Sequence, residues 1–242
     1  MAGNKYSQLI VALVAALIIS QIALHLPQFL FESTIAKMTT TQGLELFLSL
    51  MAILILGKGK FGDYGFRLPS RSHLTTGAFA LWMLGALALG SLATAAILLS
   101  GGMGNPVTKK LTFPQIILLV MISASVIEEV FTRGFLQSHL SGLADKTVKL
   151  LFIRVNLPTM ISAVFFACMH LVLLRSGADL ATVPIILVFT FLLGLMAGHQ
   201  RAKSGSLVPA IILHMLGNVG GIIGGMIYAI ITFLTTGAMP KM

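Results

Sequence analysis

The stretch "LTFPQIILLVMISASVIEEVFTRGF", residues 111–135, joins an apolar run to three charged side chains. Glu128, Glu129 and Arg133 follow the run inside what has the composition of one membrane-spanning helix. An ionisable residue at the centre of such a helix costs about 2.5–3.5 kcal/mol on insertion scales, so each one needs a partner or a function. The stretch therefore predicts a membrane helix that carries a polar site.

The composition of the whole chain agrees with this reading. Its 242 residues are 57% hydrophobic and 10% charged, whereas soluble domains carry about 25% charged residues. Because a bilayer offers no water to unpaired backbone groups, such a chain spans it as helices. We predict an all-α, polytopic integral membrane protein with one domain, residues 1–242, and no internal repeat. Cys168 lies in an apolar segment, so we expect a buried thiol and no intramolecular disulfide.

Apolar runs predict about eight transmembrane helices. Their residue ranges are 8–31, 42–57, 76–99, 113–135, 157–174, 183–200, 205–218 and 219–237. Glu45 interrupts the second range. The last two ranges share one uncharged run, and the glycine-rich "GNVGG" at 217–221 is expected to divide it.

The net charge of +9 is distributed as membrane topology requires. No basic run is interleaved with aromatic residues, so the charge gives no support to a nucleic-acid partner and favours membrane lipids. Lys and Arg collect in cytoplasmic loops, and an internal N-terminus with eight spans predicts both termini to be cytoplasmic. The cytoplasmic side then holds Lys5, Lys58, Lys60, Arg67, Arg71, Lys146, Lys149, Arg154, Arg201, Lys203 and Lys241, and the outer side holds Lys37, Lys109, Lys110 and Arg175. A seven-span count would move only Lys241.

Helical spacing separates the three charges of the opening stretch. Glu129 and Arg133 are four residues apart and share a helix face, so we expect them to form an ion pair. Glu128 is rotated by about 100° from Glu129 and is left to face another group. A structural ion pair explains Glu129 and Arg133 better than a catalytic pair does.

Two other predicted spans carry polar residues at the same spacing. His214 and Asn218 are four residues apart, and so are Phe166 and His170. A single histidine in a helix is usually a hydrogen-bonded packing residue, and that reading stays open for both. The other histidines have no comparable setting and are expected to be structural or at the surface: His25, His73, His139 and His199.

A zinc site is a further possibility. Glu128, His170 and His214 would supply three ligands and leave one open position, as in catalytic zinc sites. The chain has no H-E-x-x-H helix, and the ligands would come from three spans. Spacing alone leaves the metal open.

The three groups form ordered motifs in which "EEVFTR" at 128–133 is E-E-x-x-x-R, "FACMH" at 166–170 is F-x-x-x-H, and "HMLGN" at 214–218 is H-x-x-x-N. In that order they resemble the CPBP family, the CaaX proteases and bacteriocin-processing enzymes, which includes the Ras-converting CaaX endopeptidase. The motif core covers about residues 113–218. Each motif alone is short, whereas the ordered set on separate apolar segments is specific.

The resemblance implies an eight-helix intramembrane endopeptidase with a membrane-embedded catalytic cavity. Glu128 would activate water and His170 would position it, while His214 and Asn218 would bind the oxyanion; Glu129, Arg133 and Phe166 would support the site. The substrate would be a lipidated, CaaX-type or other membrane-bound peptide or protein. An asparagine suits an oxyanion better than zinc, so we expect no cofactor, although the family has also been described as metalloproteases.

Two other functions remain open at this stage. Intramembrane Glu and His residues also mark proton-coupled transporters, but the chain lacks paired, similarly interrupted segments in two halves. A non-catalytic bacteriocin-immunity or scaffold protein would need the same fold without the chemistry, and the intact motifs argue against it.

Overall fold

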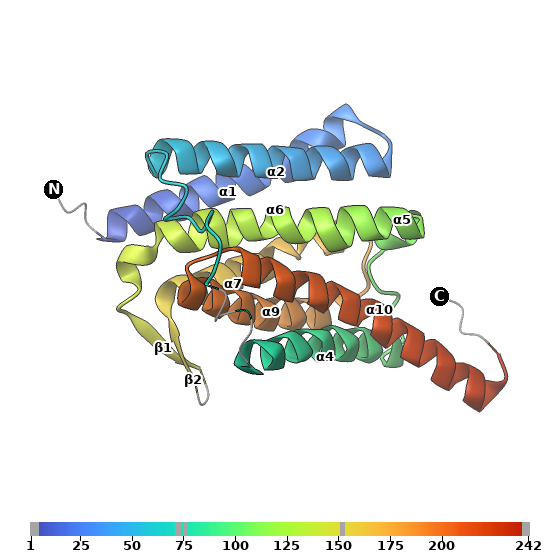
Figure 1. Ribbon diagram of the computed structural model, residues 1–242. Coiled ribbons are helices and arrows are strands. Elements are labelled where there is room, and N and C mark those ends of the chain that lie inside the picture. The colour runs from blue at the N-terminus through green and yellow to red at the C-terminus, as the bar shows by residue number, and fades with distance from the viewer. Residues whose placement is uncertain (1–4, 71–73, 75–76, 151–152, 239–242) are drawn as a thin grey trace.

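A computed structural model describes residues 5–70, 74, 77–150 and 153–238. It forms a bundle of apolar helices (Figure 1). Among these residues, seven helical segments are long and apolar enough to cross a membrane, which confirms a polytopic, helical membrane protein. They are α1 (Lys5–Leu30), α2 (Thr34–Leu56), α4 (Gly77–Leu99), the span Phe113–Gln137, the span Leu157–Arg175, α9 (Thr182–Ser204) and α10 (Val208–Thr236).

The span Phe113–Gln137 alternates between two helical geometries. It consists of α5 (Phe113–Gln115), the π-helical η2 (Ile116–Ala124), α6 (Ser125–Glu129) and the π-helical η3 (Val130–Gln137). The Gln115 side chain accepts a hydrogen bond from the Thr112 backbone N–H at 2.9 Å and so fixes the helix start. π-helical turns are rare and occur mostly at functional sites. Here they flank α6, which carries both glutamates.

The span Leu157–Arg175 is interrupted at its motif histidine, His170. α7 (Leu157–Met169) begins where the Asn156 side chain accepts a hydrogen bond from the Thr159 N–H at 2.9 Å. It ends at His170, and the short α8 (Val172–Arg175) follows. Before α7, the strands β1 (Thr147–Leu150) and β2 (Ile153–Asn156) form an antiparallel hairpin, which the all-α prediction did not include. The 3-10 turns η1 (Thr108–Lys110) and η4 (Ser141–Leu143) complete the described elements.

The predicted break at 217–221 is wrong, because α10 is one continuous helix. Its glycines form a close contact with α4: a Cβ at Gly220 would overlap the backbone of Leu87, and one at Gly224 would overlap that of Ser91. The Ser91 hydroxyl donates to the Gly220 carbonyl at 2.9 Å across this contact. Small residues let membrane helices approach closely. The glycines therefore join two helices instead of ending one.

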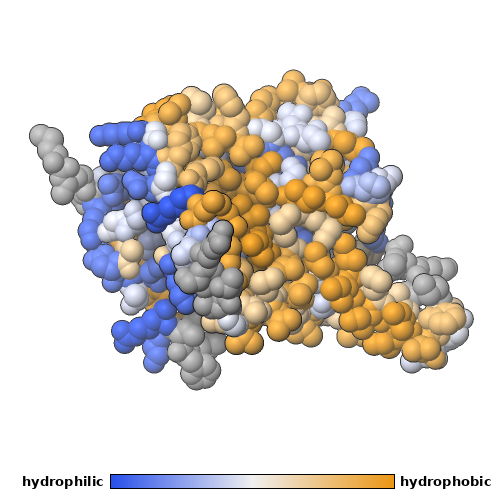
Figure 2. Space-filling view, in the orientation of Figure 1, coloured by the Kyte–Doolittle hydropathy of each residue, from blue (hydrophilic) through white to orange (hydrophobic). Residues whose placement is uncertain are grey.

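Seven crossings, not eight, change the predicted topology. Lys5 at the start of α1 and Thr236 at the end of α10 lie at opposite ends of the bundle (Figure 1), whereas eight crossings would have placed both at one end. Hydrophilic residues gather at the end where α1 begins (Figure 2). This end carries the described lysines and arginines assigned above to the cytoplasm; Arg71 and Lys241 lie outside the described residues. Which end is cytoplasmic stays a prediction.

The expected burial of Cys168 is wrong, because its side chain is exposed on the outer face of α7. The buried face of that helix carries Ala163, Phe166 and Ala167 instead. In a membrane helix an apolar environment does not require burial in protein, since lipid also supplies one.

Candidate active site

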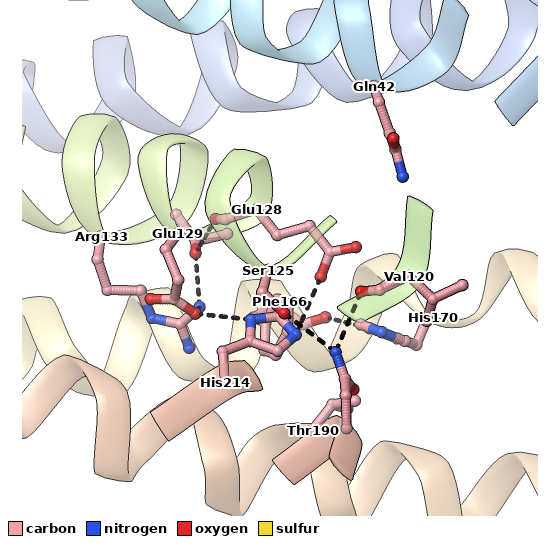
Figure 3. Close-up of polar contacts among 12 residues, drawn as sticks. Gln42, Val120, Ser125, Glu128, Glu129, Arg133, Phe166, His170, Thr190 and His214 are labelled. Carbon is pink, nitrogen blue, oxygen red and sulfur yellow. Dashed lines mark hydrogen bonds and ion pairs between the residues drawn. The ribbon is translucent and has the colours of Figure 1, made fainter. Parts of the chain in front are cut away.

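The three motifs meet in the interior of the bundle (Figure 3). α6 supplies Glu128 and Glu129, the end of α7 supplies His170, and α10 supplies His214 and Asn218. These elements are far apart in sequence, so only the fold brings them together. The convergence that the motifs imply is thus present in the structure.

The predicted ion pair between Glu129 and Arg133 is confirmed. Arg133 Nη1 lies 2.9 Å from Glu129 Oε1, and both side chains are completely buried. The guanidinium also lies 4.5 Å from the centre of the Phe166 ring, which favours the cation. Gly194 of α9 makes room for Arg133, since a Cβ there would lie 2.9 Å from Nη2.

His214 connects the ion pair to Glu128. Its Nδ1 lies 3.0 Å from Glu129 Oε1, and because a carboxylate only accepts, Nδ1 carries the proton. Its Nε2 faces Glu128 Oε2 at 3.8 Å, too far for a direct hydrogen bond. Glu129 therefore fixes the orientation and the tautomer of the His214 ring, because the hydrogen bond at one ring nitrogen decides which nitrogen carries the proton.

Glu128 is the accessible carboxylate of the pair. Its side chain is 24% exposed, whereas that of Glu129 is fully buried. The Glu128 backbone carbonyl accepts a hydrogen bond from the Thr132 hydroxyl, and Arg133 Nη1 donates to the same hydroxyl at 2.6 Å. The two adjacent glutamates are thus separated as the helical spacing predicts.

His170 is fixed at the end of α7. Its Nδ1 lies 2.9 Å from the Phe166 carbonyl oxygen, which only accepts, so Nδ1 donates. In the neutral ring Nε2 then carries a lone pair. Phe166 packs edge-on against His170 and against His214, with ring centres 4.9 Å and 5.4 Å apart. The supporting aromatic thus contacts both histidines.

Asn218 is bonded to the first part of the glutamate span. Its amide Nδ2 donates to the Ser125 hydroxyl at 3.1 Å and to the Val120 carbonyl at 3.3 Å. Val120 belongs to the π-helical η2. Both amide hydrogens therefore have acceptors here, and the Val120 bond is the longer one.

The alternative zinc set is not assembled in this structure. Among the described residues, no group of three or more His, Cys, Asp or Glu side chains lies close enough to hold a metal ion. The ring orientations do not decide this: Nδ1 of His170 donates to a backbone carbonyl and Nδ1 of His214 donates to Glu129, as metal-ligating histidines also do while Nε2 binds the ion. Within the described part of the chain, it is the separation of Glu128, His170 and His214 that does not fit a shared metal site.

Sequence reasoning missed a polar stripe on α2. Gln42, Glu45 and Ser49 are buried on one face of this helix. Gln42 donates to the Leu119 carbonyl at 2.8 Å, and Glu45 lies one turn further along the same buried face. Among the described residues, the Oε1 atom of Glu45 finds no hydrogen-bond partner. The signal was available, because Glu45 is a carboxylate within an apolar segment.

Two surface cavities of the described residues lie away from this site. One, of about 370 Å³, is apolar and lies between α4 and α9. The other, of about 340 Å³, is polar and lies at the hydrophilic end of the bundle. Neither is lined by Glu128, His170 or His214. At the candidate site, Glu128, His170 and Asn218 are partly exposed, whereas His214 is buried.

Comparison with known families identifies the segment that carries all three motifs. Residues 110–220 match the sequence model of the family described as Rce1-like, type II CAAX prenyl endopeptidase Rce1-like. This segment is therefore similar to that family, in agreement with the resemblance to the CPBP family that the three motifs carry. The match is shorter than the whole bundle and omits α1, α2 and α4. Neither the curated proteins nor the solved structures contain a match to the chain.

Proposed function

We propose that this chain is a CPBP-type intramembrane endopeptidase that hydrolyses a peptide bond with water activated by Glu128. One observation carries the proposal: His214 places its Nε2 opposite the accessible Glu128 while the buried ion pair holds its Nδ1. A gap of 3.8 Å between these two polar atoms suits a bridging water. The other motif residues surround this gap.

Glu128 is the base of the proposed reaction. It takes a proton from water, and the resulting hydroxide attacks the carbonyl carbon of the peptide bond. When the C–N bond breaks, Glu128 returns the proton to the leaving amine. His170 Nε2 accepts a hydrogen bond from the same water and positions it.

His214 and Asn218 stabilise the oxyanion in this proposal. In this proposal the His214 ring carries both protons, so Nε2 donates first to the bridging water and then to the oxyanion, and the negative charge of Glu129 compensates the positive charge of the ring. Asn218 donates from Nδ2 once the substrate oxygen replaces the distant Val120 carbonyl as its acceptor. Each such donor contributes about 2.7–4 kcal/mol to catalysis in well-studied proteases. The family description supports a prenylated CaaX-type peptide or another membrane-bound peptide as substrate.

The proposal is tested by cleavage of a farnesylated CaaX peptide and of its unprenylated counterpart by the purified chain in liposomes, with products identified by mass. We expect cleavage by the wild type and strongly reduced cleavage by His170→Ala. His199→Ala is the matched control, because His199 is an exposed histidine that stacks on Trp82 and should retain activity. Equal activity of the two variants would contradict the mechanism. Proton flux driven by a solute, without cleavage, would favour the transporter instead.

A further inference from the structure

The polar cavity of about 340 Å³ lies at the hydrophilic end of the bundle, where α1 begins and α2 ends. The loop after α2 and the turn after η3 form most of its wall. Glu128, His170 and His214 are not among the residues that line it. The cavity is therefore separate from the candidate active site.

Two lysines give this cavity a positive charge. Lys58 and Lys60 line it and are exposed, and neither forms an ion pair within the described part of the chain. Asp63 is the acidic side chain in its wall, so the formal charge of the lining remains positive. Unpaired lysines around a hollow are suited to an anionic group.

The backbone at Lys58 belongs to the turn that ends α2. Lys58 has φ of 53°, and among the described residues no other non-glycine residue has a positive φ. Across this turn the Gly59 N–H donates to the Leu54 carbonyl at 3.0 Å, as in the turns that commonly end helices, where glycine is the usual residue. The turn thus places Lys58 in the wall of the cavity, and glycine would adopt the same backbone conformation without strain.

The remaining wall adds a neutral hydrogen-bonding pair. The Tyr64 hydroxyl lies 2.9 Å from His139 Nδ1. Burial lowers the pKa of His139, and burial together with the charge of Asp63 raises the pKa of Tyr64, so both are neutral near pH 7. One of the two groups donates in this hydrogen bond and the other keeps a hydrogen of its own, the imidazole on Nε2 or the phenol on its hydroxyl. The pair therefore adds no negative charge and leaves one donor.

We propose that this cavity binds a phosphate group with Lys58 and Lys60, and that the group belongs to the headgroup of an anionic phospholipid. The cavity is lined by residues of the hydrophilic end, and the apolar surface of the bundle begins next to this end (Figure 2). The helix turns that lead to it carry exposed apolar side chains, including Ile10 on α1 and Ile55 on α2. Acyl chains lie along such a surface while the headgroup stays at the interface. Free phosphate shares the chemistry but makes no use of this apolar surface.

The test measures binding of phosphatidylglycerol to the full chain in detergent micelles by native mass spectrometry, with phosphatidylcholine and inorganic phosphate as the other probes. A basic residue near an anionic membrane surface contributes about fivefold in affinity. We expect the double variant Lys58→Ala, Lys60→Ala to bind phosphatidylglycerol about 25-fold more weakly. The matched control is Lys109→Ala, Lys110→Ala, an exposed lysine pair at the other end of the bundle, and it should bind like the wild type.

Lys58→Gly keeps the assay informative if the double variant is unstable, because glycine suits the backbone at this position. We expect a higher melting temperature together with about fivefold weaker binding. If inorganic phosphate competes with phosphatidylglycerol, the cavity is a phosphate site, but its ligand is the soluble ion. The assignment to a phospholipid headgroup would then be wrong. Equal retention of phosphatidylglycerol by both lysine-pair variants, or unchanged binding in Lys58→Gly, would overturn the proposal. None of these readouts depends on peptidase activity.

Discussion

Removal of either partner of the Glu129–Arg133 pair is expected to be more damaging than removal of both. Arg133→Leu leaves a fully buried carboxylate without its cation, and Glu129→Leu leaves a fully buried guanidinium; breaking a buried pair in this way costs about 3–5 kcal/mol. Glu129→Leu falls within that range, because it also removes the hydrogen bond to His214 while Arg133 keeps its contacts with Thr132 and the Phe166 ring. Apolar replacement of both partners is close to neutral.

The double variant also loses the hydrogen bond between Glu129 and His214, which contributes about 1.5–3 kcal/mol because one partner is charged. We therefore expect the free energy of unfolding of Glu129→Leu, Arg133→Leu to fall by about 3 kcal/mol or less, whereas independent effects would give about 6–10 kcal/mol. Equilibrium unfolding in mixed micelles, followed by the fluorescence of the single tryptophan, Trp82, measures the difference.

The exposed ion pair between Lys5 and Asp145, 3.3 Å apart, is the matched control for this cycle. Its coupling should be far weaker than that of the buried pair, because exposed pairs are screened by solvent. Additive losses at Glu129 and Arg133 would refute the account of the ion pair as one compensated unit.

Three further results are expected. Gly220→Ala should destabilise the protein by about 1–3 kcal/mol and lower activity, because the new Cβ meets the Leu87 backbone and moves α10. Gly225→Ala has room for a Cβ and should change neither stability nor activity. Equal melting temperatures of the two variants would contradict the close α4–α10 contact. Hydrogen bonds from the Met103 N–H and from the first turn of α9 lower the pKa of Asp179 from 3.8 to about 2. Since the unfolded chain takes up this proton first, the melting temperature should fall between about pH 4 and pH 2 and fall less in Asp179→Asn; an equal fall in both would exclude this carboxylate as a cause. Cleavage should persist in the presence of a chelator, and loss of activity that zinc restores would establish a metal-dependent mechanism.

Local spacing was enough to predict the main parts of the candidate site. The four-residue separation of Glu129 and Arg133 gave their ion pair, since helical neighbours are fixed by the helix itself. Polar residues within separate apolar segments, namely His170, His214 and Asn218, predicted the other members of the site. Their mutual geometry, such as the contact between His214 and Glu129, depended on the packing of α10 against α6 and was not accessible from spacing.

The errors arose where the partner of a residue decides its role. The glycines at 217–221 predict a break between two helices, but in the structure they lie inside α10 and allow its close contact with α4. In the sequence Glu45 only interrupts a predicted span, because its burial depends on the packing of α2 against the glutamate-bearing span. The bond from Asn218 to Val120 depends on a π-helical segment that a period of 3.6 residues does not reveal.

The central claim is that Glu128, and not its neighbour, activates water. The most direct measurement is the initial rate of peptide cleavage by Glu128→Gln at wild-type protein concentration, with the melting temperature recorded on the same sample. We expect a rate about 10²–10⁴-fold lower with an unchanged melting temperature, because Glu128 forms no buried ion pair with a permanent cation and supplies general base catalysis. A cleavage rate within threefold of the wild type would contradict the account.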